Sequence, residues 1–541
     1  MMAIAGAMAR PTPRASTRAR AGEKDPIVWI PARSDRAVRR PPVSRARVAV
    51  DRASGAPRSP ARLRARARPR RDGALHRLAS TADRVSSSSA ASPNDDAAAI
   101  EPPSPSPSPS PPAKKKRAFI PALDSTRFFL ITYIAVGHFI ACCTKDPLTL
   151  RMLSQVNVVV GAFFVLSGYV VAYTCTELGE YRASPRISPA PAFILSRVMG
   201  YYPLYLLAQV VFGWVFVYAD NLYNGPIATV FHGLITMTLT QAWFPAHAEL
   251  WNAPTWFLSA LTFATVALPF CLPSIASWKK KGLKTAMIAL TAISLIAKVA
   301  YSYDTGGWFF MEGVMSPKTH PSWLFWNAQR FSPFAALVEI LIGCVAARSV
   351  MVRECADKGE EKGFNENGES STVTDTDTNN ASGWMASSPV VPLLGMAFVL
   401  IARGFEWLTL NDGLTRGLFF IPLFVSFIKR IHVQTVYVDL PNAAKEGHKS
   451  FSTMMSHKWL TYLGAISFPI YILHGPIGQI FYKRAVASKL WGTVFTKYPE
   501  FFPAYLAIVL LAAVVVHEKF MKNKAIQGWF QERGQAIAAK F

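Results

Sequence analysis

Long apolar stretches separated by short polar ones constrain the fold of this 541-residue chain most strongly. An α-helix rises about 1.5 Å per residue, so about 20 apolar residues cross the hydrocarbon core of a bilayer. Hydrophobic residues make up 51% of the sequence, which fits a chain embedded in lipid. We therefore predict an all-α fold, a polytopic membrane helix bundle. Its candidate spans are residues 124–143, 157–175, 199–219, 227–241, 253–274, 284–301, 332–349, 388–404, 415–431, 460–482 and 501–517.

Segment 227–241 decides the number of spans. It is short for a crossing, and it contains His232. If it does not cross, most Lys- and Arg-rich loops, such as KKKGLK at 279–284, fall on one side of the bilayer. If it crosses, every later loop changes side and this bias is lost. We therefore predict about ten transmembrane helices, both termini on the cytosolic side, and 227–241 as a re-entrant or interfacial piece.

The first 117 residues differ in composition from the rest. Residues 1–98 are rich in Arg, Ala and Ser, which predicts a disordered N-terminal extension with the composition of an organellar transit peptide. The alternative is a basic arm lying on anionic lipid. A plastid membrane fits this composition best, then a mitochondrial membrane, and an endomembrane if the extension is retained. Residues 99–117 are a Pro/Ser-rich linker ending in the basic run KKKR.

The remaining sequence divides into a membrane domain and a tail. The predicted membrane domain covers residues 118–518, and 519–541 form the C-terminal tail. Within the domain, residues 351–387 are polar and rich in acids, which predicts a disordered loop. No part of this division suggests a separate soluble domain.

The net charge and the cysteines exclude two function classes. The formal net charge is +25, but residues 1–117 contain 25 Lys and Arg against 9 Asp and Glu, so most of it lies in the extension. Positive loops beside apolar segments account for the rest, and we expect no nucleic-acid partner. The six cysteines include no CxxC motif and no cluster with histidines, so we predict neither a zinc site nor a disulfide framework.

Two ionisable residues, Arg127 and His138, lie in the first apolar segment, RFFLITYIAVGHFIACC. A helix turns about 100° per residue, so eleven residues return His138 to the helix face of Arg127. Charged groups inside a spanning helix cost at least ~2.5 kcal/mol, and such residues usually face a polar interior. One interpretation is structural, with Arg127 reaching the headgroups and His138 bonding between helices. In the other, His138 is a general base.

Five segments, taken in order, resemble the signatures of the acyltransferase type 3 family of multi-pass membrane O-acyltransferases. They are the first segment with its arginine and histidine eleven residues apart, NVVVGAFFVLSGYVVAY, FILSRVMGYYPLYLL, WNAPTWFLSALTFATVALP and YLGAISFPIYILHGP. The resemblance covers residues 120–518. It implies transfer of an acyl group, usually acetyl, from acyl-coenzyme A to a hydroxyl of a carbohydrate, lipid or other small acceptor.

The resemblance also implies roles for the residues of the first segment. His138 matches the essential histidine of the family and Arg127 its basic partner. His138 would take the proton of the acceptor hydroxyl or carry the acyl group transiently. Arg127 would meet the phosphates of the donor, for which a guanidinium group suits well. We expect no bound cofactor and no metal, only acyl-CoA, most simply acetyl-CoA, as co-substrate.

Further candidate substrate contacts each have a structural alternative. Arg197 either contacts coenzyme A or anchors its helix at the interface. Ser167 either packs between helices or lines the site. Ser467, Tyr471 and His474 lie along one helical stripe and either line the acceptor path or support His138; the alternative for His474 is that it merely precedes the helix break at Gly475-Pro476. The last candidates, Trp256 and Ser259, line a pocket or belong to an interfacial belt.

The sequence departs from the family pattern at three positions. Gly200 stands where the family has the second arginine of its arginine-x-x-arginine, Gly161 where it commonly has an acidic residue, and Leu261 where it has a glutamate. These departures leave a catalytically inactive relative as one alternative. A proton-coupled transporter or flippase that uses Arg127 and His138 is another, although the two halves of the chain show no inverted repeat.

Overall fold

The computed structural model describes the membrane domain and the tail that follows it. The described residues belong to one compact unit. They are 81% helical, and within them there is no β-strand, only an isolated bridge between Thr176 and Ala183. The all-α prediction is therefore confirmed for this part of the chain. The extension 1–98, the linker up to residue 116 and loop 353–387 lie outside the described residues, which are 117–311, 320, 322–352, 388–440 and 450–541.

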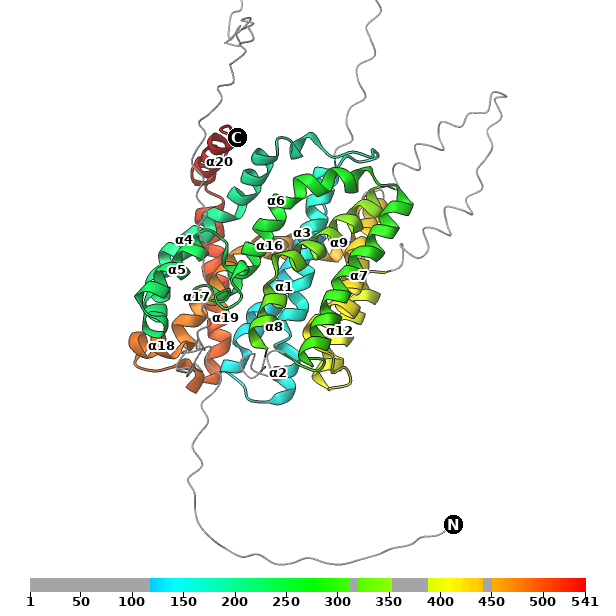
Figure 1. Cartoon of the computed structure of the whole chain (residues 1–541). Coiled ribbons are helices and arrows are strands. Elements are labelled where there is room, and N and C mark those ends of the chain that lie inside the picture. Colours follow the sequence, from blue (N-terminus) through cyan, green and yellow to red (C-terminus); the bar gives the residue numbers. More distant parts are fainter. Residues whose placement is uncertain (1–116, 312–319, 321, 353–387, 441–449) are drawn as a thin grey trace, which may run out of the picture. The chain divides into compact units, whose positions relative to one another are not determined.

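Figure 1 shows the helices in chain order, with α2 and α18 toward one end of the bundle and α20 at the other. The longer elements are α1 (Pro121–Phe139), α2 (Pro147–Leu153), α3 (Val156–Cys175), α4 (Ala190–Asn224), α5 (Pro226–Met237), α6 (Trp256–Ser277), α7 (Lys280–Thr305), α8 (Trp323–Phe331), α9 (Pro333–Met351), α12 (Val390–Gly404), α13 (Asp412–Thr415), η6 (Arg416–Phe420), α14 (Ile421–Val433), η7 (Gln434–Asp439), α15 (Phe451–Met455), α16 (Lys458–Ala465), α17 (Ser467–Tyr482), α18 (Arg484–Trp491), α19 (Phe502–Val516), η10 (His517–Met521) and α20 (Lys524–Ala538).

Seven helical stretches of the described residues are long and apolar enough to cross a membrane, which shows an integral membrane protein. An eighth is α16 with α17, bent by 49° at their junction. The 12-residue α5 is too short, as the charge distribution predicted for 227–241. The 15-residue α12 is also short, and α13 to α14 is not among the seven. The total of ten spans therefore stays a prediction.

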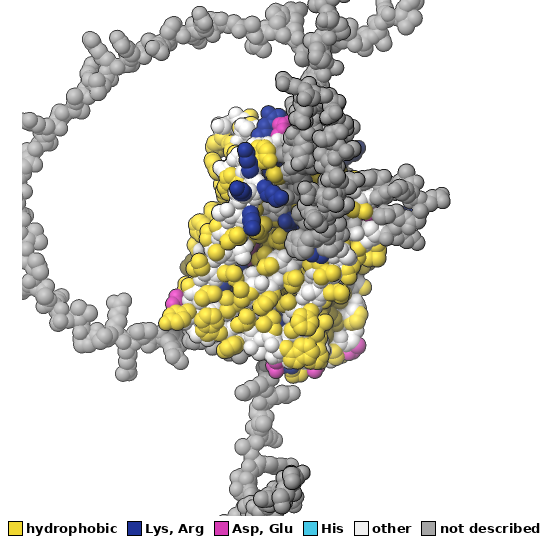
Figure 2. Space-filling view, turned by 90° about the vertical axis from the view of Figure 1, so that its right-hand side faces the viewer, with side chains coloured by type: hydrophobic (Ala, Val, Ile, Leu, Met, Phe, Trp, Pro, Cys, Tyr) yellow, Lys and Arg dark blue, Asp and Glu magenta, His cyan; other side chains and the backbone are white. Residues whose placement is uncertain are grey.

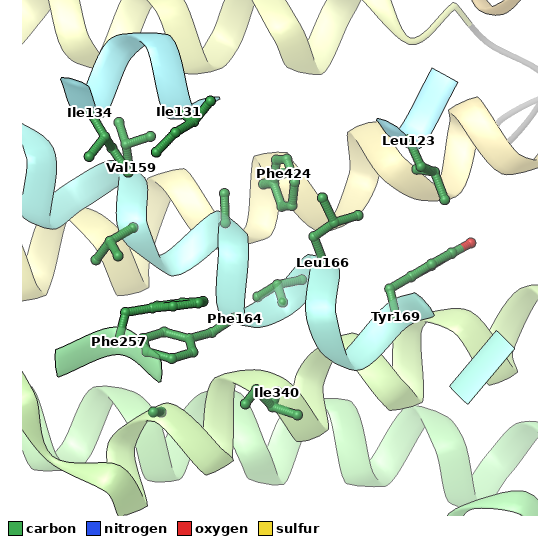
Figure 3. Packing of buried hydrophobic residues seen from close by; sticks show 14 of the residues in the cluster. Leu123, Ile131, Ile134, Val159, Phe164, Leu166, Tyr169, Phe257, Ile340 and Phe424 are labelled. Carbon is green, nitrogen blue, oxygen red and sulfur yellow. The ribbon is translucent and has the colours of Figure 1, made fainter. Parts of the chain in front are cut away.

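The core lies between α3 and α9, which pack more extensively than any other described pair. Two glycines permit this close crossing. A Cβ atom on Gly168 would lie 1.8 Å from the carbonyl oxygen of Ile340, and one on Gly343 would lie 1.9 Å from that of Val165. Small residues let helix backbones approach in this way inside membranes. Figure 3 shows the apolar side chains around the crossing, among them Phe164.

The outer helices present an apolar surface. Only 11% of the most apolar window of α7 is buried, against 72% for α2 and α3. Figure 2 shows this apolar surface, with most of the visible Lys and Arg side chains gathered toward its upper end. An apolar band with cations concentrated at one side is typical of a helix bundle in a bilayer.

The α5–α6 loop (residues 238–255) folds back against α17. Asn252 donates from Nδ2 to the carbonyl oxygen of Ile472 at 3.0 Å, and Gln479 donates from Nε2 to that of Trp251 at 2.7 Å. Gly475 permits the approach, because a Cβ atom there would lie 2.7 Å from Oδ1 of Asn252. The loop therefore holds α17 against the start of α6, which positions the site described next.

Candidate functional site

A pair of histidines joins the first and the penultimate predicted spans. His138 lies in the last turn of α1, and its Nδ1 is 3.0 Å from Nε2 of His474 on α17. The two rings are nearly parallel, at 8°, with centroids 5.2 Å apart. His474 is fully buried, whereas His138 is exposed. His138 is therefore the accessible ring of the pair.

The hydrogen bonds assign the proton positions in this pair. Nδ1 of His474 lies 3.1 Å from the carbonyl oxygen of Ile470, which can only accept, so this nitrogen carries the hydrogen. In the neutral ring Nε2 of His474 is then an acceptor, and His138 donates to it from Nδ1. This leaves Nε2 of His138 with a free lone pair. A neutral imidazole with a free nitrogen is suited to take a proton.

Aromatic side chains extend from the histidine pair into the bundle. The Tyr471 hydroxyl donates to the carbonyl oxygen of Pro254 at 2.7 Å, and its ring lies 6.3 Å from that of His474. The Phe257 ring is 5.9 Å from Tyr471 and 4.4 Å from Phe164. Sequence analysis predicted Tyr471 as a site residue, and the structure brings it next to the histidines.

Three other predicted residues take part mainly in packing. Ser259 accepts a hydrogen bond from the amide of Ala242 at 3.1 Å and is buried. Ser167 donates to the carbonyl oxygen of Phe163 in its own helix at 2.7 Å. Trp256 is buried with its ring 4.9 Å from that of Phe331. Only Trp256 adjoins the aromatic side chains that lead toward the histidines.

The two predicted cations lie away from the histidine pair. Arg127 is eleven residues before His138 and forms an ion pair with Asp124 one turn earlier, with its side chain 34% exposed. Arg197 donates to Oγ1 of Thr174 at 3.1 Å and to Sγ of Cys175 at 3.0 Å, at the C-terminal end of α3. Both stand at helix ends on the side that the charge rule assigns to the cytosol. That Arg127 and Arg197 contact the coenzyme A of the acyl donor stays a prediction.

The positions that depart from the family pattern differ in their surroundings. A Cβ atom on Gly161 would lie 2.4 Å from Nε of Arg416, so the absence of a side chain makes room for that guanidinium group. Gly200 is exposed, and a Cβ atom there would meet nothing within 4 Å. Leu261 is partly buried. Sequence analysis treated Gly161 as a lost acid, whereas Glu339 of α9 supplies a carboxylate to Arg416.

Two groups of buried charges are among those that sequence analysis missed. Glu339 pairs with Lys298 at 3.1 Å and with Arg416. Glu249 of the α5–α6 loop pairs with Arg330 of α8. Burial raises the pKa of Glu249 to about 7, although Arg330 beside it acts in the opposite direction. The rule that singled out His138, an ionisable residue within an apolar segment, applies equally to Lys298 and Glu339 and could have found them.

A second histidine pair lies where α4, α5 and the α5–α6 loop meet. His232 donates from Nδ1 to the carboxylate of Asp220 at 2.9 Å, and its Nε2 is 2.9 Å from Nδ1 of His247. Asp220 also accepts from Nε1 of Trp251 at 2.9 Å and from Nδ2 of Asn224 at 2.7 Å. Burial and His232 lower the pKa of His247. Sequence analysis named His232 only as a polar residue in a short segment.

Comparisons with known proteins point to one family. A family model described as an acyltransferase domain, Acyl_transf_3, matches residues 120–518. No curated protein and no solved structure matches the chain. Within the described residues, no group of three or more His, Cys, Asp or Glu side chains is placed to hold a metal ion.

Proposed function

This chain belongs to the acyltransferase type 3 family, and from that premise we propose that it is a membrane-bound O-acyltransferase using acyl-CoA. The acyl group, most simply acetyl, passes to a hydroxyl of a carbohydrate, lipid or other small acceptor. The observation that carries this proposal is the free Nε2 of His138, on an exposed ring oriented by His474. General base catalysis of acyl transfer needs a nitrogen of this kind.

The transfer step follows from the proton positions. Nε2 of His138 takes the proton of the acceptor hydroxyl while its oxygen attacks the thioester carbonyl carbon. As the tetrahedral intermediate collapses, the carbon–sulfur bond breaks and the ester forms. The proton on His138 passes to the departing thiolate, which leaves as free coenzyme A. The base is then neutral again, and no net proton is gained or lost.

His474 acts as a positioning residue in this mechanism. Its Nε2 accepts from Nδ1 of His138 both before and after the proton is taken, so the ring stays in one orientation. The acceptor on the far side of His474 is a backbone carbonyl, which also stabilises a positive imidazole. This arrangement supports Nε2 rather than Nδ1 of His138 as the nitrogen that meets substrate.

The donor would approach from the cytosolic side in this proposal. The charge distribution predicts that side for the ends of α1 and α4 that carry Arg127 and Arg197, and a guanidinium group binds phosphate through paired hydrogen bonds. Gly200 leaves open space at the family's second arginine position, so Arg197 would act there without that partner. Because Gly200 supplies no second guanidinium group beside Arg197, we expect a weaker donor affinity than a pair of arginines at these two positions would give.

The test is transfer of labelled acetyl from acetyl-CoA by membranes that contain the wild-type protein or the His138→Ala variant. We expect His138→Ala to lower transfer by at least about 100-fold, because a positioned base contributes roughly 10²–10⁴. Protein levels should be similar, since His138 is exposed and the change leaves α1 intact. Equal transfer and hydrolysis by both membranes would refute the proposal. Loss of the variant protein from the membrane would instead favour a packing role.

A further inference from the structure

We infer that Asn252 of the α5–α6 loop is a positioning residue for the proposed base. Its side chain supplies the hydrogen bond that Pro476 removes from α17, and it thereby holds the turn of α17 that carries His474. This inference rests on the proposed acyltransferase function, and it adds a residue that acts through His474 instead of on the reacting atoms.

Pro476 interrupts the hydrogen bonds of α17 beside the histidine pair. It lies in the interior of this helix, two residues after His474. Proline has no amide hydrogen, so it cannot donate to the carbonyl oxygen four residues earlier. In α17 that oxygen belongs to Ile472, which is fully buried. Inside a membrane domain water does not satisfy a buried carbonyl, so a side chain from another element has to do so.

Asn252 provides the missing donor. Its Nδ2 donates to the carbonyl oxygen of Ile472 at 3.0 Å, and its side chain is fully buried. The carbonyl can only accept, so the nitrogen of the amide must face it. Gly475 makes the approach possible, because a Cβ atom there would lie 2.7 Å from Oδ1 of Asn252 and 3.1 Å from Cδ of Pro254. Asn252 therefore takes the place of the amide hydrogen that Pro476 lacks.

The turn held in this way is the one that presents His474 to His138. Asn252 binds this turn from the α5–α6 loop, and the Tyr505 hydroxyl of α19 donates to the carbonyl oxygen of His474 at 3.0 Å. A helix bends most easily where its hydrogen bonds are interrupted, so these two contacts fix the direction of the turn. The 3.0 Å contact between the two imidazoles depends on that direction, because hydrogen bonds weaken steeply with misalignment.

Loss of the Asn252 side chain should act on the reaction through this turn. The Ile472 carbonyl would lose its donor, the turn would shift to find another, and His474 would no longer hold His138 in one orientation. A misplacement of about 1 Å in a catalytic group can lower a rate by roughly 10²-fold. Because Asn252 bonds to the backbone of α17, we expect kcat to fall and the KM for acetyl-CoA to stay the same.

A simpler role for Asn252 would be to fasten the loop. Gln479 offers the comparison, because its Nε2 donates to the carbonyl oxygen of Trp251 at 2.7 Å and forms another hydrogen bond between α17 and the same loop. Gln479→Leu loosens the loop without removing a donor from any carbonyl of α17. The two roles therefore predict different responses when position 476 regains an amide hydrogen.

The test is a double-mutant cycle with Pro476→Ala, which returns the amide hydrogen to α17. Transfer of labelled acetyl is measured for the wild type, Asn252→Ala, Pro476→Ala and the double variant. We expect Asn252→Ala to lower kcat about tenfold, Pro476→Ala to stay within about threefold of the wild type, and the double variant to recover most of the loss. A double variant as slow as Asn252→Ala would overturn the inference.

Gln479→Leu is the matched control for this cycle. We expect Pro476→Ala to leave the transfer rate of Gln479→Leu unchanged, because the Trp251 carbonyl remains without its donor. Equal recovery of Asn252→Ala and Gln479→Leu would overturn the inference, since Pro476→Ala would then compensate for any loosening of the loop.

A second cycle shows whether Asn252 acts through His474. In a His474→Ala background the ring that Asn252 positions is absent, so adding Asn252→Ala should lower transfer by no more than about twofold. A further tenfold loss in that background would show that Asn252 acts on the reaction by another route, and the positioning role would be wrong.

Thermal unfolding of the purified full-length protein in detergent covers a failure of Asn252→Ala to fold or of the chain to transfer acetyl. Asn252→Ala should lower the melting temperature or prevent accumulation, and the double variant with Pro476→Ala should restore it. Absence of restoration would overturn the inference whatever the activity. Restored stability in a chain whose wild type transfers no acetyl would count against the proposed transferase function and support the compensation between Asn252 and Pro476.

Discussion

The molecule contains two histidine pairs with almost the same separation but different third partners. His138 and His474 are 3.0 Å apart, and the chain of hydrogen bonds ends on a backbone carbonyl. His232 and His247 are 2.9 Å apart, and that chain ends on the carboxylate of Asp220. The outer ring of each pair is the one farther from the third partner, His138 in the first pair and His247 in the second. His138 is exposed, whereas His247 is half-buried next to Phe231.

The different third partners and exposures indicate that His138 and His474 form a reactive pair, whereas His232 and His247 form a structural one. A carboxylate that accepts from a histidine, a tryptophan and an asparagine forms a closed network that holds α4, α5 and the α5–α6 loop together. Both outer rings leave Nε2 without a hydrogen-bond partner among the described residues, but this nitrogen belongs to an exposed side chain in His138 and to a half-buried one in His247. The separation of two imidazoles therefore says little about their chemistry, which depends on the third partner and on the space beside the outer ring.

The strongest test of this contrast removes the inner ring of each pair. His474→Ala should lower acetyl transfer by about 100-fold, because His138 loses the acceptor that orients it. His232→Ala should retain transfer within a factor of a few. Transfer rates across a range of pH should show a changed acid limb for His474→Ala, partly restored in His474→Gln. An equal loss of transfer in His474→Ala and His232→Ala would remove the distinction.

A smaller effect is expected at the carboxylate of the structural pair. Asp220→Asn should lower the free energy of unfolding by about 1–3 kcal/mol, because buried donors on His232 and Trp251 lose a charged acceptor. Chemical denaturation in detergent measures this loss, and transfer at low temperature should be unchanged. A variant that is fully stable yet inactive would place Asp220 in the reaction rather than in the scaffold.

The smallest effect concerns Glu249, in the loop that joins the two regions. Its pKa is raised from 4.5 to about 7, so the folded state favours the protonated carboxyl. The stability that it contributes is present below about pH 4.5 and is lost as the pH rises through about 7. The melting temperature of Glu249→Gln relative to the wild type should therefore rise between pH 5 and pH 8. Parallel melting curves for the two proteins would contradict this expectation.

Local patterns in the sequence predicted the helical fold and part of the site. Apolar segments of span length correspond to helices such as α1, α3 and α19, because crossing a bilayer requires a local run of apolar residues. Helical spacing also brought out Tyr471 and His474 as a stripe, and the structure places both near His138. Ser167 and Ser259, predicted from the same motifs, form hydrogen bonds that serve packing.

Partnerships between distant segments could not be read in the same way. Glu339 and Arg416 are 77 residues apart, and nothing in the local pattern of either segment indicates the other. Gly161 illustrates the problem, because the missing side chain suggested a lost acid until the structure placed Arg416 over it. The α5–α6 loop similarly lies against α17 through contacts more than 200 residues apart.

By itself, the sequence determined that this chain is a helical membrane protein with an acyltransferase domain, because span length and ordered motifs are properties of continuous segments. Only the tertiary structure decided which ionisable groups meet. His138 and His474, or Lys298, Glu339 and Arg416, acquire their chemistry from neighbours on other helices. The physical reason is that proton position and charge balance depend on distances of about 3 Å, which helix packing sets and helix sequence does not.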